Sequence, residues 1–453
     1  MRNGVDIPPP STDPAPNANY SLSALNLIRF RRNPLSFLQG MARRSGDIVP
    51  FRMGGQQMFL VNHPSYIHEV LVTRNANFVK GRALQRAKRL LGEGLLTSEG
   101  ERHRRQRMLA QPAFHRQRIA SYAEVMVRHA DRMSNRWQPG VTMDISQEMT
   151  RLTLGIVAKT LFDADVESEA EEIGEAMTCI LGMFNLLLFP FADLLEKTPL
   201  PAMRRYRRMR ERLDSVIYRI INERRQSGAD HGDLLSMLLL ARDEEHGGGM
   251  SDTEVRDEAL TLFLAGHETT AATLSWIWYL LSEHPEVDAK LAGELNVQLN
   301  GRLPGMADIP QLPYTEAVVA ESMRLYPPAW AIGRRALSEQ RIGGVAVPAD
   351  GIVLLSPFVT HRDARFFPDP ERFDPQRWTP EARQSRPPYC YFPFGGGPRR
   401  CIGESFAWAE TILILATLAT RWRARLVPGT GVTPKALITL RPKHGVHVAL
   451  EPR

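Results

Sequence analysis

The stretch Phe394-Gly395-Gly396-Gly397-Pro398-Arg399-Arg400-Cys401-Ile402-Gly403 joins a glycine-rich turn to a cysteine just before a predicted helix over residues 404–420. Backbone N–H groups near a helix N-terminus favour negative charge, so a thiol placed there ionises readily. A thiolate is a strong ligand for iron. The glycines let the backbone lie flat against a large group, and Arg399 offers a cation to a carboxylate. The stretch predicts an iron site, with a purely structural cysteine as the alternative.

A glycine-rich turn before a helix can also hold a phosphate. The dinucleotide pattern G-x-G-x-x-G, counted from Gly395, would need glycine at position 400, where the chain has Arg400. No Walker lysine follows the turn. The motif therefore does not predict a nucleotide site.

Composition limits the class of protein. The chain has 453 residues, of which 43% are hydrophobic and 24% charged, as in soluble globular proteins with a large core. Its three cysteines, Cys179, Cys390 and Cys401, lack metal-finger spacing, which argues against a disulfide framework and indicates a cytoplasmic protein. The net charge of +7 suits an acidic partner surface. Aromatic residues are not interleaved with the basic ones, so nucleic acid is not expected as a partner.

The N-terminal residues and the longest apolar run indicate how the chain is organised into domains and whether a segment enters a membrane. Residues 1–20 are rich in Pro, Asn and Asp and predict a flexible lead without a signal peptide or anchor. Residues 21–453 are expected to form a single domain. The apolar run 259–281 carries His267 and Glu268 in its middle, which would be costly in lipid. We therefore expect a helix buried in a protein core and no membrane anchor.

The periodicity of the chain predicts a mainly α fold with a smaller β-rich part. Ser251 and Glu254 form a capping box that begins a helix reaching to about residue 281. The arginine-rich run 204–212 is interpreted as a solvated helix face. The other expected elements are one helix mixed with short strands across 21–78, with paired strands at 48–51 and 57–61, helices across 101–218, a helix at 315–326, short strands up to the cysteine turn, and a terminal hairpin within 437–448.

The middle of the long helix contains Ala265-Gly266-His267-Glu268-Thr269-Thr270. Residues 265, 266, 269 and 270 share one face, where small side chains leave room for a ligand and hydroxyls line the space. The Thr269 hydroxyl is expected to bond the carbonyl of Ala265. Glu268 and Thr269 suggest a proton-delivery pair. The alternatives are that Gly266 packs against a neighbouring helix and that Glu268 forms a buried salt bridge, while His267 is interpreted as structural.

Glu321 and Arg324 are three residues apart on one helix face with largely apolar neighbours. A buried pair of this kind needs further partners. The segment 367–373, with its rigid prolines, presents Arg372, which would complete the network by bonding Glu321. The alternative is a surface pair of little energetic weight.

Together and in this order, the A-G-x-E-T-T, E-x-x-R, P-E-R-F and F-G-x-G-x-R-x-C-x-G segments resemble the cytochrome P-450 family of haem-thiolate monooxygenases. The resemblance spans from about residue 101 to the C-terminus. It implies the cytochrome P-450 fold, in which a long central helix lies over a haem with a proximal cysteine loop. The implied cofactor is haem b, with dioxygen as co-substrate.

The resemblance also implies roles for matching positions. The Cys401 thiolate would be the axial metal ligand, and Glu268 and Thr269 would deliver protons. A tryptophan often stands in the family where this chain has His103, whose ring N–H can still donate to a propionate. Either Arg334 or Arg335 would bind a propionate. The residues implied at the cofactor are Phe394, Gly395, Arg399, Gly403, His103, Arg107, Ala265 and Gly266, and those implied in the structural network are Glu321, Arg324 and Arg372.

By analogy with the family, apolar segments line a pocket suited to a lipophilic substrate. The candidate pocket residues are Leu95, Phe184, Leu187, Leu264, Ala329, Ile332 and Leu437. The expected reaction is hydroxylation or epoxidation of a terpenoid, a fatty acid or a polyketide-like metabolite. Electrons would come from a separate ferredoxin or flavodoxin with its reductase, docked at Arg104, Arg105 and Arg400. We expect a monomer. The alternatives are a peroxide-using or isomerising haem-thiolate enzyme and a non-catalytic haem- or ligand-binding protein.

Overall fold

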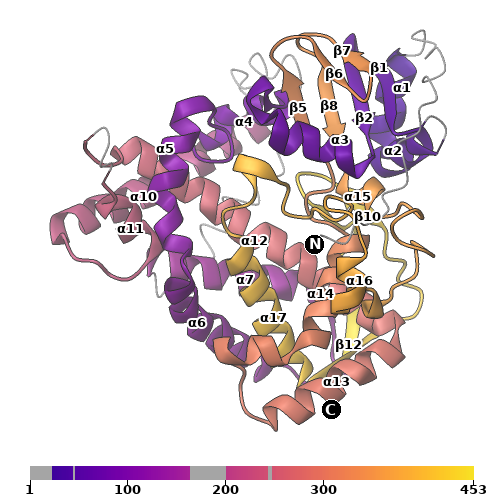
Figure 1. Cartoon of the computed structure of the whole chain (residues 1–453). Coiled ribbons are helices and arrows are strands. Elements are labelled where there is room, and N and C mark those ends of the chain that lie inside the picture. The colour runs from indigo at the N-terminus through magenta and orange to yellow at the C-terminus, as the bar shows by residue number, and fades with distance from the viewer. Residues whose placement is uncertain (1–22, 44–45, 164–199, 243–246) are drawn as a thin grey trace. The chain divides into compact units, whose positions relative to one another are not determined.

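The computed structural model describes residues 23–43, 46–163, 200–242 and 247–453 (Figure 1). The chain divides into two compact units. We call Met1–Arg82, Glu316–Cys401 and Thr433–Lys443 the sheet unit, and Ala83–Thr315, Ile402–Val432 and His444–Arg453 the helical unit. Helices dominate and the strands form small sheets, which confirms the mainly α class. The predicted lead at residues 1–20 lies outside the described residues.

The helical unit contains long helices and one small sheet. Its helices are α4 (Arg82–Leu91), which begins at the last residue of the sheet unit, α5 (Gly100–Ala110), α6 (Arg116–Ser134), α7 (Ile145–Phe162), α10 (Pro201–Ser227), α11 (Leu234–Leu240), α12 (Asp252–Glu283), α13 (Pro285–Leu299) and α17 (Glu404–Ala419), with short turns η4 (Gln111–Phe114) and η5 (Met306–Gln311). The antiparallel sheet has the order β4 (Thr142–Asp144), β12 (His447–Pro452), β9 (Trp422–Leu426).

The long helix α12 is the centre of the helical unit. Ser251 and Glu254 form the predicted capping box, and Pro285 begins the next helix. All ten residues from 255 to 264 are buried, since α7, α10 and α17 pack around α12 (Figure 1). None of the helices in the described ranges combines the length and apolar character that crossing a membrane requires. The prediction of a core helix is therefore confirmed.

The sheet unit contains the larger sheet and the segment leading to Cys401. Its elements are α1 (Ser23–Arg32), α2 (Pro34–Ala42), β1 (Ile48–Met53), β2 (Gln56–Val61), α3 (Pro64–His68), η2 (Glu69–Thr73), η3 (Asn75–Asn77), β3 (Phe78–Lys80), β5 (Ile332–Ala336), β6 (Gln340–Ile342), β7 (Val345–Val347), β8 (Ile352–Leu355), α15 (Pro357–Thr360), η6 (Pro375–Trp378), α16 (Pro380–Gln384), η7 (Gly397–Arg399), β10 (Pro434–Ala436) and β11 (Leu440–Pro442). Helix α14 (Pro313–Leu325) lies almost wholly in this unit.

The five-stranded sheet has the order β1-β2-β8-β5-β3, with β2 and β8 parallel and the other pairs antiparallel. The predicted hairpin of β1 and β2 is confirmed. Gly54 and Gly55 make its turn with φ of 54° and 77°, a left-handed region that favours glycine. The sheet therefore supplies a rigid support in which β5, paired on both sides, carries Arg334.

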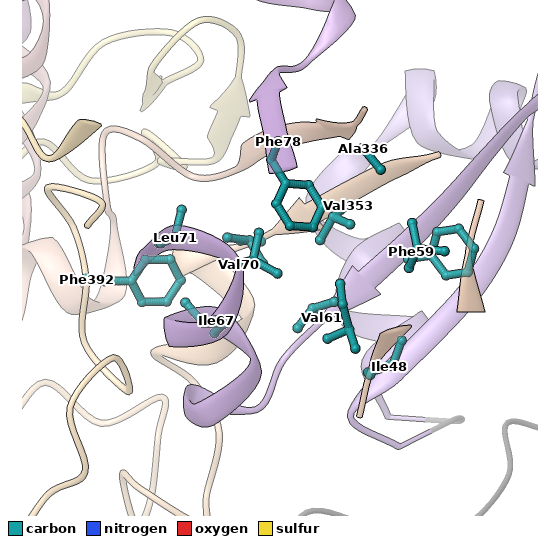
Figure 2. Close-up of a cluster of buried hydrophobic side chains, with 13 residues drawn as sticks. Ile48, Phe59, Val61, Ile67, Val70, Leu71, Phe78, Ala336, Val353 and Phe392 are labelled. Atoms are coloured by element: carbon teal, nitrogen blue, oxygen red, sulfur yellow. The ribbon is translucent and has the colours of Figure 1, made fainter. Parts of the chain in front are cut away.

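One face of this sheet packs into a buried apolar cluster (Figure 2). Phe59, Val61 and Val353 come from the strands, and Ile67 and Leu71 come from α3 and η2. Phe392, from the segment that leads to Cys401, packs into the same cluster. The sheet unit thereby holds the start of the cysteine loop by apolar burial.

Two expectations about elements are wrong. One helix was expected within residues 21–78, but Pro34 starts a second helix, α2, whose first turn is capped by the Asn33 side chain, and α3 follows β2. The expected hairpin within 437–448 is instead β10 with β11, which ends at Pro442. The following residues join the other unit, because the N–H of Val446 donates to Asp144 Oδ1 at 3.0 Å and β12 pairs with β4 and β9.

Candidate functional site

The loop from Phe392 to Cys401 is closed by its own backbone. The N–H of Cys401 donates to the carbonyl of Phe394 at 3.0 Å, and that of Gly395 donates to Phe392 at 3.0 Å. Gly395 and Gly397 have φ of 71° and 65°, which other residues adopt only with strain. The backbone conformation therefore requires glycine at positions 395 and 397.

The same loop is held tightly by its neighbours in the sheet unit. A Cβ on Gly397 would lie 1.9 Å from the carbonyl oxygen of Leu71, and a Cβ on Gly396 would lie 2.4 Å from the ring of Tyr389. Ile332 of β5 approaches Gly395, 3.7 Å from where its Cβ would be. With Phe392 buried beside Leu71 (Figure 2), the loop has little freedom to move. Cys401 is therefore presented by a rigid support.

The two described cysteines differ in accessibility. Cys390 is buried, and desolvation raises the pKa of its thiol to about 12. Cys401 is exposed and stands three residues before the first residue of α17. An accessible thiol near a helix N-terminus fits a thiolate ligand for a metal, whereas Cys390 fits a core position. Cys179 lies outside the described residues.

The middle of α12 carries the predicted notch. The hydroxyl of Thr269 donates to the carbonyl of Ala265 at 2.7 Å, as predicted, and that of Thr270 donates to Gly266 at 3.2 Å. Ala265 is exposed, and Glu268 and Thr269 are half-buried, although the preceding residues of the helix are buried. This face therefore retains open space beside a hydroxyl oxygen and a carboxylate.

Two residues of the notch segment have structural roles. A Cβ on Gly266 would lie 3.0 Å from Val157 of α7, so the alternative that Gly266 packs against a neighbouring helix is confirmed. His267 is buried, and its Nδ1 lies 2.9 Å from the carbonyl oxygen of Phe263. Burial lowers the pKa of His267, which keeps the ring neutral. The structural interpretation of His267 is also confirmed.

Two groups of basic side chains are suited to bind carboxylate groups. On α5, His103 is buried and Arg107 half-buried, one helical turn apart. On β5, Arg334 is buried, whereas Arg335 forms an ion pair with Asp350. Of the two arginines left open by the sequence, Arg334 is therefore the better candidate.

Lys80 is a residue that the sequence analysis missed. It is buried on β3 and lies directly opposite Arg334 in the β3–β5 register. Two cations facing each other across strands suit an anion more than they suit each other. A lysine inside a short apolar strand before a glycine was the only signal of this position in the sequence.

Glu321 and Arg324 form the predicted buried pair, and both are fully buried. Arg324 Nε and Nη2 each lie 2.8 Å from a Glu321 oxygen. The remaining Arg324 donors reach the carbonyls of His361, Pro370 and Arg372. The arginine therefore has an acceptor for each of its donor directions, which a surface pair would not need.

The second arginine of the network is not the predicted one. Arg372 is exposed and contributes its backbone carbonyl, whereas Arg377 Nε lies 3.3 Å from Glu321 Oε1. Trp378 Nε1 and the N–H of Asp374 also donate to Glu321, each at 2.9 Å. The short turn η6 carries Arg377 and Trp378 to the carboxylate, and this placement overturns the prediction for the Arg372 side chain.

The predicted pocket residues divide between the two units. In the helical unit, Leu95 and Leu264 are buried. In the sheet unit, Ala329, Ile332 and Leu437 are half-buried, and Trp330 Nε1 donates to the carbonyl of Leu437 at 2.9 Å. Phe184 and Leu187 lie outside the described residues.

A mainly helical fold with a cysteine on a glycine loop indicates a haem-thiolate enzyme, and comparison with known proteins agrees. The cytochrome P-450 family model matches residues 9–447. Cyclooctatin synthase of Streptomyces melanosporofaciens is 42% identical over 412 residues, or 90% of this chain and 89% of its own. Pentalenene oxygenase of Streptomyces avermitilis is 37% identical over 412 residues, which cover 90% of this chain and 91% of that protein. The chain belongs to the cytochrome P-450 family of monooxygenases, whose cofactor is a haem with a thiolate ligand.

Proposed function

We propose that this enzyme inserts one oxygen atom of dioxygen into a lipophilic small molecule by hydroxylation or epoxidation, and that a terpenoid is the first substrate class to test. The observation that carries the proposal is the exposed Cys401 thiol on a braced glycine loop. Apolar candidate residues such as Leu264 and Ile332 support a lipophilic substrate. The names of the relatives, cyclooctatin synthase and pentalenene oxygenase, support the terpenoid class.

The chain would hold its cofactor through Cys401 and through basic side chains. Cys401 Sγ would bind the haem iron, since it is the accessible thiol of the described residues. Arg399, His103, Arg107 and Arg334 would bind the propionates, and Lys80 would add a further cation beside Arg334. When bound, the haem activates dioxygen with electrons delivered from outside the chain.

Thr269 and Glu268 would deliver protons. The Thr269 proton is engaged by the carbonyl of Ala265, so the lone pairs of Oγ1 remain able to accept a hydrogen bond in the notch. A water held at Oγ1 would be positioned to pass on a proton, and the half-buried Glu268 carboxyl would replenish it from solvent. The small side chain of Ala265 keeps this space open.

The electrons would come from a separate ferredoxin or flavodoxin with its reductase. Arg104 and Arg400 are exposed and support docking of an acidic carrier. Arg105 suits this role less, because it lies 3.4 Å from Glu254 and donates to the carbonyl of Gly249 at 3.0 Å. The few cysteines support a reducing, cytoplasmic setting.

The absorption spectrum of the reduced protein under carbon monoxide tests the ligand assignment. We expect a strongly red-shifted Soret band from the native protein and its loss in Cys401→Ser. Cys390→Ser is the matched control and should keep the band, since Cys390 is buried. A Cys401→Ser variant with an unchanged band would refute Cys401 as the ligand.

The proton-delivery role has its own test. Thr269→Ala should consume electrons without forming a proportionate amount of product from a terpenoid substrate. Thr273→Ala is the control, because Thr273 also bonds the carbonyl four residues back, at 2.9 Å, but lies one turn beyond the notch. Unchanged coupling in Thr269→Ala would contradict the role and favour peroxide use.

A further inference from the structure

The turn between α4 and α5 lies directly on α12. A Cβ on Gly92 would lie 2.1 Å from the Asp257 carboxylate, and one on Gly94 would lie 2.3 Å from Thr261 Oγ1 and 2.5 Å from the Asp257 carbonyl oxygen. Glycine at these two positions is what allows the backbone to come so close. The turn at residues 92–98, which we call the staple loop, is therefore built against the N-terminal half of α12.

Two consecutive carboxylates of α12 hold the staple loop by its backbone. Asp257 Oδ2 accepts the N–H of Glu93 at 2.7 Å, and Glu258 Oε2 accepts the N–H of Leu95 at 3.0 Å. Glu258 is fully buried and Leu95 is 8% exposed. A carboxyl group in the core is costly unless hydrogen-bond donors meet it, and the N–H of Leu95 is one such donor.

The helical period relates this contact to the notch. Ala265 and Thr269 follow Glu258 by seven and eleven residues, which places each of them within about 20° of Glu258 around the helix. Seven residues correspond to about 10 Å along the axis. The amide of Leu95 is thus fixed on the same face of α12 as the notch, about two turns towards the N-terminus.

The rest of the staple loop is held independently of Glu258. Gln106 of α5 donates to the carbonyl of Glu93 at 2.7 Å, and the Thr97 hydroxyl donates to that of Gly92 at 2.7 Å. The N–H groups of Thr97 and Ser98 both donate to the carbonyl of Gly94 at 2.9 Å. Loss of the Glu258 contact would therefore remove the acceptor of the Leu95 N–H while these other contacts of the loop stay in place.

We propose that Glu258 is a positioning residue that fixes Leu95 as the end wall of the space along α12 and so limits the length of the apolar molecule that fits there. The inference rests on the proposed function, because it takes the open face at Ala265 as part of the substrate space. It assigns specificity to a buried acid that touches no substrate. The backbone N–H of Leu95 is the atom through which Glu258 acts.

Hydrogen exchange and ligand length together test the proposal. In Glu258→Leu, exchange of the amides of the staple loop should accelerate by about tenfold or more, because the carboxyl acceptor of the Leu95 N–H is lost. A series of n-alkylimidazoles, followed by the Soret shift of the holoenzyme, should then bind best at a longer alkyl chain than in the native protein. Glu258→Gln keeps an amide oxygen as acceptor and should restore both readouts.

Control variants separate the steps of the inference. Glu283→Gln changes an exposed acid at the far end of α12 and should alter neither readout. Leu95→Ala should lengthen the preferred alkyl chain without accelerating exchange, and it tests the wall if Glu258→Leu fails to fold. If a folded Glu258→Leu variant exchanged its amides at native rates, Glu258 would not hold the staple loop. If Leu95→Ala kept the native preference for alkyl-chain length, Leu95 would not be the end wall. Failure of the proposed function would show separately, as loss of the native carbon monoxide band.

Discussion

Glu321 and Glu410 are both fully buried glutamates, one in each unit, but their surroundings are opposite. Glu321 accepts hydrogen bonds from Arg324, Trp378 and the Asp374 N–H. Glu410 of α17 lies beside the Thr270 hydroxyl, whose own hydrogen bond goes to Gly266, and no basic side chain of the described residues pairs with it. Burial raises the pKa of Glu410 to about 8. Burial without a cation penalises the charged form of a carboxyl group, so Glu410 holds its proton more tightly than a carboxyl in water does.

The largest effect should come from removing the cation at Glu321. Arg324→Ala removes the two hydrogen bonds that Arg324 donates to the buried Glu321 carboxylate and should lower the free energy of unfolding by about 3–5 kcal/mol. Urea unfolding monitored by tryptophan fluorescence measures the change, and expression yield reports it if the variant does not fold. A midpoint equal to that of the native protein would mean that the network carries no stability.

Replacing Glu410 should increase the free energy of unfolding, whereas replacing Arg324 should decrease it. The folded pKa of Glu410, about 8, exceeds the ordinary value of 4.5, so the native protein loses stability as pH rises from about 5 to 8. Glu410→Gln removes this loss and should raise stability by up to about 3 kcal/mol at pH 7. Thermal unfolding at several pH values gives the test. A variant with the same pH slope as the native protein would contradict the assignment.

His361 should make the sheet unit less stable at acid pH, which adds a second difference between the sheet unit and the helical unit. Burial lowers the pKa of His361 well below 6.5, and the Phe392 N–H donates to its Nε2 at 2.9 Å. Stability should therefore fall by about 1.4 kcal/mol per pH unit as pH drops below 6.5. Hydrogen exchange of the two units between pH 5.5 and 8 should show the sheet unit loosening towards acid. His361→Gln should flatten this dependence, and an unaltered acid slope would rule His361 out.

The smallest effect distinguishes two arginines near Glu321. Arg377→Ala should cost about 1–3 kcal/mol, because it removes a cation 3.3 Å from a buried carboxylate. Arg372→Ala should change stability by less than about 0.5 kcal/mol, since its side chain is exposed and its carbonyl remains. Equal costs for the two variants in urea unfolding would show that Arg372 shares the network after all.

Local features were predictable because their partners lie within a few residues. The capping box of Ser251 and Glu254 and the bond from Thr269 to Ala265 involve residues three and four positions apart. The hairpin around Gly54-Gly55 and the helix after Cys401 depend on turn chemistry and apolar periodicity. Such interactions repeat in any helix or turn of the same sequence, so the residues alone are enough to predict them.

The order of the motifs in the sequence is also enough to identify the family, and hence the haem-thiolate cofactor. Tertiary structure alone decided which arginine meets Glu321, because Arg377 comes from a turn more than fifty residues along the chain and competes with the nearby Arg372. It also placed Glu258 on the amide of Leu95, 163 residues away, and put no cation of the described residues beside Glu410. Spacing cannot reveal such partners, because each depends on how separately formed elements pack and on which charges that packing removes from water.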